Sequence, residues 1–198
     1  MSPFIGEFIG TAILFLFGSG VVANVVLNKT NGQNGGWIVI TFGWAMAVFI
    51  GVFISVKLGG SGHLNPAVTI ALAATGQFSS SMVGTYLLAQ LAGAFTGAVI
   101  VWLTYHSHFE ITDDADLKKA IFCTAPGIRK PLNNVFTEFI GTFVLMFGAL
   151  SFTDPAASMG TLNALPVSLV VLGIGLSLGG PTGYAINPAR DLGPRIAH

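Results

Sequence analysis

The residues with the most specific chemistry in this sequence are two copies of the tripeptide Asn-Pro-Ala. They stand at Asn65-Pro66-Ala67 and Asn187-Pro188-Ala189. Asparagine is a favoured helix N-cap and proline is favoured at the first helical position, so each copy predicts the start of a helix. A capping asparagine accepts a bond from its own helix through its side-chain oxygen, which leaves its NH2 group as a fixed donor directed outward.

Two such helices that met head to head would bring about half a positive charge each to one place. Cations, protons included, would be repelled there. A water molecule would accept bonds from Asn65 and Asn187 and donate away from the centre, which interrupts the uniformly oriented chain that a proton relay requires. A single Asn-Pro-Ala is an ordinary turn or helix start, but both copies follow glycine-rich runs, at 59–62 and 179–183. The pair therefore favours a channel for neutral solutes.

The composition of the chain is that of a membrane protein. Its 198 residues are 53% hydrophobic and 8% charged, whereas a soluble domain carries charge on about a quarter of its residues. Eight basic and eight acidic side chains balance, so no basic surface is available for a nucleic-acid partner. With one cysteine and no nucleophile-base-acid set, the sequence predicts no enzyme, no metal site and no cofactor.

Five apolar stretches approach the roughly 20 residues that a membrane-crossing helix needs. They cover residues 4–27, 37–56, 82–105, 135–152 and roughly 162–178. Two shorter apolar pieces, 67–74 and 189–197, follow the glycine-rich runs and are predicted to be re-entrant half-helices. Irregular backbone at membrane depth survives only where protein buries it or where it lines a water-filled cavity. We therefore expect an all-α membrane bundle around a pore.

The chain contains an internal repeat. Glu-Phe-Ile-Gly-Thr occurs at 7–11 and again at 138–142, and an Asn-Pro-Ala follows each copy. Three predicted spans separate the copies, which gives them opposite orientations and puts the functional site near the midplane. We expect one channel domain, 1–198, with a first repeat of about 1–110 and a second of about 132–198. By symmetry a sixth span belongs after residue 197, and we expect it to be absent from this chain.

These residues resemble the major intrinsic proteins, the aquaporin and aquaglyceroporin family, over the whole chain. The motifs that carry the resemblance are His-Leu-Asn-Pro-Ala-Val at 63–68 and Gly-Tyr-Ala-Ile-Asn-Pro-Ala-Arg-Asp at 183–191. Asp191 directly after Arg190 is similar to the glycerol-facilitator branch, as in bacterial glycerol uptake facilitators. The resemblance implies an inverted-repeat aquaporin-like bundle of six spans and two re-entrant half-helices. It also implies a multi-pass protein of the cell membrane, surrounded by lipid and assembled as a homotetramer.

The resemblance further implies a narrow selectivity filter made by Trp44, Gly175, Tyr184 and Arg190. Two aromatic faces suit the carbon edge of a polyol, and a guanidinium donates to the hydroxyls on the other edge. Gly175 is expected to leave room that a bulkier residue would fill, and Arg190 to discourage cations. Glycerol and water are the expected solutes. Because many glycerol channels have phenylalanine where this chain has Tyr184, dihydroxyacetone, hydrogen peroxide and neutral lactic acid stay open as well.

Four further residues are expected to support the loops. An ionisable group inside a span is costly and by default functional. Glu7 and Glu138 are therefore interpreted as proton-relay carboxylates of a transporter or, as the resemblance implies, as acceptors for backbone N–H groups of the re-entrant loops. His63 is expected to hold its loop rather than to titrate as a gate. Asp191 lies in the first turn of its half-helix, where the helix dipole favours a carboxylate, so capping is expected.

The remaining polar and aromatic features have simpler interpretations. The connection 106–134 carries four acidic and four basic residues, and with its charges cancelled it is expected to face water. Trp37 and Trp102 lie near span ends and are expected to be interface anchors.

Two other functions stay open beside a passive channel. An ion-coupled secondary transporter shares the inverted-repeat plan, and a structural membrane protein with a closed pore shares the whole fold. Flux of glycerol without an ion gradient discriminates the channel from both.

Overall fold

The computed structural model describes residues 2–151 and 160–198, and every regular element within them is helical. In these ranges four stretches are long and apolar enough to cross a membrane. They are α1 (Pro3–Val26), α2 (Trp37–Lys57), the 3-10 turn with α4 (Ser80–Thr104, α4 itself being Val83–Thr104) and α7 (Pro131–Ser151). The prediction of an all-α membrane bundle is confirmed.

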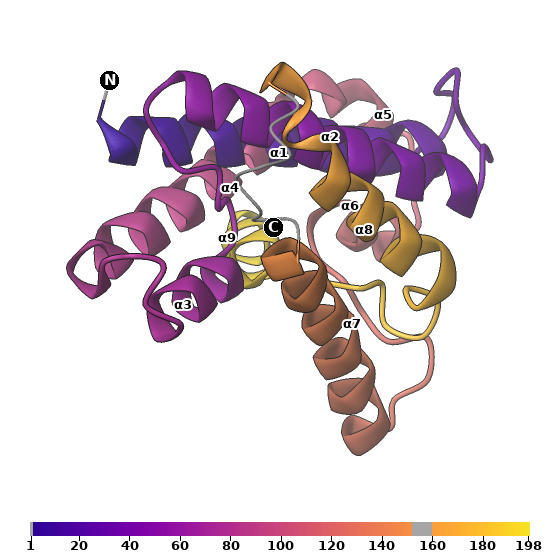
Figure 1. Ribbon diagram of the computed structural model, residues 1–198. Helices are drawn as coiled ribbons and strands as arrows, with labels where there is room; N and C mark the ends of the chain where they lie inside the picture. The colour runs from indigo at the N-terminus through magenta and orange to yellow at the C-terminus, as the bar shows by residue number, and fades with distance from the viewer. Residues whose placement is uncertain (1, 152–159) are drawn as a thin grey trace.

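Helix α1 is the centre of the first half, because it packs along both α2 and α4 (Figure 1). Small residues let the backbones approach closely. A methyl group at Gly93 would lie 2.3 Å from the carbonyl oxygen of Phe8, and one at Gly97 would lie 2.6 Å from that of Ala12. The glycines of α4 therefore fix the crossing of α1 and α4 at distances that no larger residue allows.

Two short helices lie where the sequence predicts half-helices. They are α3 (Pro66–Ala74) and α9 (Pro188–Ala197), and each begins at the proline of an Asn-Pro-Ala. Figure 1 shows α9 near the centre of the molecule, and both short helices pack against α4. At about 1.5 Å per residue, neither can cross a hydrocarbon core of about 30 Å.

The second half differs from the prediction at its fifth apolar stretch. Helix α8 covers Leu165–Ser177, which is 13 residues and thus about 20 Å long. The span expected over 162–178 is therefore wrong in its length. Pro166 stands in the first turn of α8, where proline is well tolerated, and a 3-10 turn (Gly160–Leu162) precedes it. The predicted end of the fourth span, Phe152, lies outside the described residues.

The connection 106–134 does more than face water, so that prediction is wrong in part. It contains α5 (His106–Glu110) and α6 (Ala115–Phe122). Ile121 and Phe122 are buried, and the hydroxyl of Ser19 in α1 donates to the carbonyl of Ile121. The charged residues stay outside while the end of α6 is tied to the bundle.

Large apolar side chains cover the outside of the long helices. Examples are Ile38, Leu88, Phe136 and Phe147, all well over half exposed. Soluble proteins rarely show so much contiguous apolar surface. Such a surface is compatible with a lipid bilayer around the long helices.

A glycine substitution tests the close crossing of α1 and α4. Gly93→Ala should destabilise the protein by about 1–3 kcal/mol, because backbone atoms rather than a flexible side chain stand in the way. Gly84→Ala is the matched control, since nothing lies within 4 Å of a methyl group at this other glycine of α4. Thermal unfolding in detergent measures both variants. Equal melting temperatures for the two would contradict the interpretation.

Candidate functional site

The site is built around the starts of the two half-helices. The side-chain oxygen of Asn65 accepts from the backbone N–H of Ala67 at 2.9 Å. That of Asn187 accepts from Ala189 at 3.0 Å and from Arg190 at 3.2 Å. Both asparagines are therefore N-caps, and the proline after each occupies the first turn. The N-terminus of each half-helix therefore presents free backbone N–H groups and the positive end of its helix dipole.

The two asparagines also cross-link the half-helices. The amide nitrogen of Asn65 donates to the carbonyl of Ile186 at 2.9 Å, and that of Asn187 donates to the carbonyl of Leu64 at 2.9 Å. The sequence predicts that both N–H groups of each amide point outward, but one of the two is used in this pair. An amide has two N–H donors, so one per asparagine is left for a solute.

Glu7 holds the first loop by accepting four hydrogen bonds. One carboxylate oxygen accepts from the backbone N–H of His63 at 3.0 Å and from Ser55 at 3.1 Å. The other accepts from the N–H of Leu64 at 2.8 Å and from Gln90 at 2.9 Å. Glu7 is fully buried, so these donors are what offset its loss of water.

Glu138 does the same for the second loop. It accepts from the backbone N–H groups of Ala185 at 3.1 Å and Ile186 at 3.0 Å, and from the hydroxyl of Thr182. In both halves the two bonded N–H groups belong to the residues directly before the asparagine. The N–H groups are thereby turned away from the cavity, since both point toward a carboxylate.

His63 is anchored on both its backbone and its ring. Beyond the bond to Glu7, its ring nitrogen Nδ1 lies 3.0 Å from the hydroxyl of Thr69. The ring also packs against Phe78 and Tyr86, with centroids 4.7 and 5.1 Å away. These contacts agree with the loop-holding interpretation of His63.

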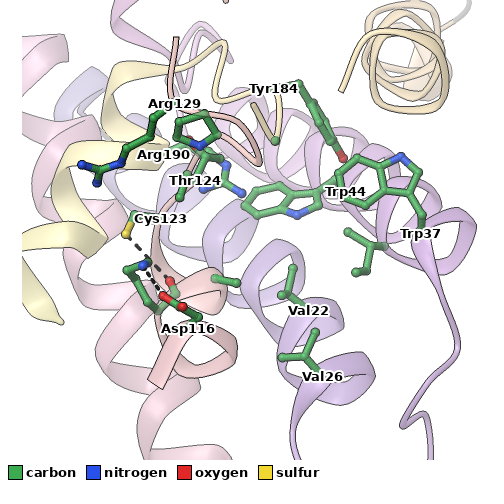
Figure 2. Close-up of a pocket in the computed structure, with 16 residues that line it drawn as sticks. Val22, Val26, Trp37, Trp44, Asp116, Cys123, Thr124, Arg129, Tyr184 and Arg190 are labelled. Carbon is green, nitrogen blue, oxygen red and sulfur yellow. Dashed lines mark hydrogen bonds and ion pairs between the residues drawn. The ribbon is translucent and has the colours of Figure 1, made fainter. Parts of the chain in front are cut away.

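The four residues expected to form a filter lie together. The guanidinium carbon of Arg190 lies 4.3 Å from the ring centroid of Trp44, which is cation–π distance. Trp44, Tyr184 and Arg190 are all buried and line the same narrow cavity. Figure 2 shows Trp44 beside Arg190, with Tyr184 above it.

Gly175 acts differently from the expectation that it leaves room for a solute. A methyl group at Gly175 would lie 2.9 Å from Cζ of Tyr184 and 3.0 Å from its hydroxyl oxygen. The room is thus filled by the tyrosine ring, and Gly175 lets that ring lie against α8.

Trp37 belongs to the site, although its place at a span end predicts an interface anchor. Its indole N–H donates to the carbonyl of Gly175 at 2.9 Å, and its ring meets that of Tyr184 edge to face at 5.8 Å. The sequence signal was weak, because a tryptophan at a span end is ordinarily at the lipid interface. Only the packing of α2 against α8 reveals its role.

Asp191 ties the connection 106–134 to the second half-helix. One carboxylate oxygen accepts from both the backbone N–H and the hydroxyl of Thr124, at 2.8 and 3.0 Å. The other accepts from Arg195 at 2.8 Å, and Arg195 in turn donates to the carbonyl of Thr124. Asp191 therefore supports a loop instead of capping its own helix, which Asn187 caps. Nothing in the sequence marks Thr124 as its partner.

Three cavities follow one another along the site. An outer cavity of about 590 Å³ and a narrow one of about 50 Å³ share Trp44, Tyr184 and Arg190 in their walls. The narrow cavity and an inner one of about 280 Å³ share Asn65 and Asn187. Since a water needs roughly 10–15 Å³ of such volume, the narrow part holds only a few small molecules. Leu14, Val48, Leu145 and Val171 form the apolar side of its wall.

The charge of Arg190 is not neutralised by a hydrogen-bonded partner. Within the described residues its guanidinium makes no hydrogen bond to an acceptor, and its buried Nη1 is unpaired. The carboxylate of the neighbouring Asp191 is occupied by Thr124 and Arg195. The guanidinium therefore keeps hydrogen-bond donors that no described residue satisfies.

The outer cavity is lined by further ionisable groups beside Arg190, among them Arg129, which adds a second positive charge. Burial raises the pKa of the Cys123 thiol, so it stays uncharged near neutral pH. The hydrogen bond from Lys119 lowers the pKa of Asp116, so this carboxylate stays ionised and paired with Lys119. Among the described residues, Arg190 is the charged one that also lines the narrow cavity.

Comparison with known proteins gives one consistent result. A family model described as "Major intrinsic protein" matches residues 1–198. The chain is 54% identical over 198 residues to "Probable glycerol uptake facilitator protein" of Thermotoga maritima, covering 100% of this chain and 84% of that protein. It is 53% identical to "Glycerol uptake facilitator protein 3" of Lactiplantibacillus plantarum, covering 98% and 80%. The X-ray structure of the aquaglyceroporin from Plasmodium falciparum matches with a TM-score of 0.88 and 35% identity, covering 98% and 79%.

The bonds of Glu7 are testable by replacement with its amide. Glu7→Gln puts an NH2 group opposite N–H or O–H donors and should destabilise the protein by at least about 1–3 kcal/mol, since buried donors lose their acceptor. Glu110→Gln is the control, because that side chain is 65% exposed and lies 3.6 Å from the ring nitrogen of His106. Melting temperatures in detergent measure both. A Glu7→Gln variant as stable as the control would refute the loop-holding role.

Proposed function

Because the chain belongs to the major intrinsic protein family, we propose that it is a passive channel that carries glycerol and water across the cell membrane and excludes ions and protons. The protein is a multi-pass membrane channel and not an enzyme. The observation that carries the proposal is Arg190, a buried guanidinium that lies over Trp44 at the narrow cavity and makes no hydrogen bond to an acceptor among the described residues.

The chemistry of the narrow cavity suits a small polyol. Arg190 donates to hydroxyl oxygens, while Trp44 and the apolar wall accommodate the carbon edge. Glycerol has both edges, and two relatives with about half of their residues identical are named as glycerol facilitators or probable facilitators. Water, dihydroxyacetone, hydrogen peroxide and neutral lactic acid meet the same requirements of size and hydrogen bonding, so the proposed solute range includes them.

Exclusion of ions and protons follows from the two half-helix starts and Arg190. Each start contributes about half a positive charge, and Asn65 and Asn187 each keep one N–H group for a solute oxygen. A water that accepts both bonds has its own hydrogens directed away from the centre, so a chain of waters changes orientation there. A metal cation is repelled by the charge of Arg190 and again by the positive N-termini of the two half-helices.

The proposal extends to the architecture. Residues of about 1–110 and 132–198 act as the two inverted repeats of one channel domain. The protein works as a homotetramer with one pore in each subunit, and lipid and neighbouring subunits cover the exposed apolar faces of the helices.

Flux through proteoliposomes tests the function. Vesicles with the protein should swell in an inward glycerol gradient faster than protein-free vesicles, at a rate that Na⁺ or proton gradients do not change. A rate that follows an ion gradient would indicate a coupled transporter. Swelling no faster than in protein-free vesicles, for every small neutral solute, would indicate a closed pore.

Arg190→Ala tests the exclusion of ions. Two unit charges about 4 Å apart repel by about 4 kcal/mol at an effective dielectric constant of about 20, so cation leak should rise by at least about tenfold. Potassium-selective dye assays in proteoliposomes measure the leak. Arg195→Ala is the control, since this arginine bonds Asp191 and Thr124 and lines none of the three cavities. Equal leak in both variants would remove Arg190 from the filter.

A further inference from the structure

The ring of His63 lies at the end of a chain of buried hydrogen bonds that begins at Glu7. The amide nitrogen of Gln90 donates to Glu7 and to the hydroxyl of Thr69, each at 2.9 Å. That hydroxyl donates to the carbonyl oxygen of Asn65 at 3.2 Å, and it lies 3.0 Å from Nδ1 of His63. Glu7, Thr69 and Gln90 are fully buried, so water does not compete for these bonds.

The orientation of the Gln90 amide is fixed at the start of this chain. An ionised carboxylate only accepts hydrogen bonds, so Gln90 turns its NH2 group, and not its oxygen, toward Glu7. Both hydrogens of that group are then used, one by Glu7 and one by Thr69. The Gln90 oxygen stays buried without a partner among the described residues, because turning the amide over would place this oxygen against the carboxylate.

The same count of donors decides which ring nitrogen of His63 carries the proton. The Thr69 hydroxyl has one hydrogen and two lone pairs. It donates the hydrogen to Asn65, and one lone pair accepts from Gln90. All three contacts of the hydroxyl are hydrogen bonds only if its second lone pair accepts from Nδ1–H of His63. In the neutral ring the other nitrogen, Nε2, then has a lone pair and no proton.

Nε2 of His63 is accessible from the inner cavity. His63 is partly exposed and lines that cavity. In the described part of the chain, the buried polar side-chain atoms without a partner belong to Gln90, Tyr184 and Arg190. Nε2 makes no hydrogen bond to a described residue and is not one of these buried atoms, so it has exposed surface. Most other side chains of the inner cavity are apolar, which makes a side-chain acceptor there uncommon.

We propose that this buried chain holds His63 as the tautomer with its proton on Nδ1, so that Nε2 accepts a hydrogen bond from a solute hydroxyl in the inner cavity. This inference rests on the proposed function. Asn65 and Asn187 donate at the midplane, so a solute there accepts with its oxygens and has its hydrogens directed away from the centre. Nε2 accepts one of these hydrogens on the inner side. The other tautomer would present a further donor instead.

The tautomer can be measured in the unaltered protein. Nuclear magnetic resonance of isotope-labelled histidine, at a pH of about 8.5 where histidine rings are neutral, shows which ring nitrogen carries the proton. The chain has four histidines, and the variants His106→Gln, His108→Gln and His198→Gln assign the other three. A proton on Nδ1 of His63 is expected. A proton on Nε2 would overturn the inference.

Thr69→Val tests whether the tautomer matters for transport. Valine keeps the branched shape but removes the acceptor of Nδ1–H, so part of the molecules should carry the His63 proton on Nε2. Glycerol flux into proteoliposomes should then fall by about two- to tenfold, as expected for one hydrogen bond. Thr69→Ser keeps a hydroxyl and should restore both the tautomer and the flux. Thr96→Val is the matched control, since this hydroxyl donates to the carbonyl of Ala92 in its own helix and Thr96 lines none of the three cavities.

Two results with Thr69→Val would contradict the inference. A changed tautomer with unchanged flux would show that Nε2 takes no part in transport. A reduced flux with the proton still on Nδ1 would show that Thr69 only supports the fold. If Thr69→Val does not fold, the unaltered protein decides: its Nε2 resonance should shift on addition of glycerol and not of sucrose, and absence of a shift would overturn the inference.

Failure of the proposed function is a separate outcome. If the unaltered protein carries no glycerol, the channel proposal fails, although the labelled ring still reports the tautomer of His63. If the protein carries glycerol and the proton lies on Nε2, only this inference fails.

Discussion

Two hydrogen bonds between irregular backbone segments are what the rest of the structure depends on. The amide of Asn65 donates to the carbonyl of Ile186, and the amide of Asn187 donates to that of Leu64. Chain without regular structure at membrane depth must bond its peptide groups inside the protein. The long helices surround these irregular segments and keep them from lipid. The narrow and the inner cavity both border the joint, where the regular backbone of each half-helix begins.

The two repeats keep the same contacts around this joint although their surroundings differ. The first-repeat glycine of Glu-Phe-Ile-Gly-Thr, Gly10, lies against Leu64, and its counterpart Gly141 lies against Ile186. The glutamates of the motif bond the N–H groups of the same two residues. The motif therefore encodes the loop support in both halves.

Much of this site could be predicted because its residues act locally or repeat. An N-cap, a proline after it and a glutamate in an apolar span each carry meaning without knowledge of distant partners. The contributions of Trp37, Thr124 and Gly175 could not be predicted in this way, since each depends on segments that meet only in the folded chain. Gly175 is the clearest case: the missing side chain was interpreted as empty space, whereas the ring of Tyr184 fills it. The short α8 was missed because hydropathy alone does not show where a helix starts.

The unpaired guanidinium of Arg190 has a consequence for how fast molecules move. In the proposed channel its bonding partners are the solute molecules, so the donors of the constriction are satisfied only while a molecule is inside it. When one solute molecule leaves Arg190, the next one forms the same hydrogen bonds with it, and the helices need not rearrange. Transit through such a wall is an exchange of partners in single file, and its throughput rises with the supply of molecules on the side of higher concentration.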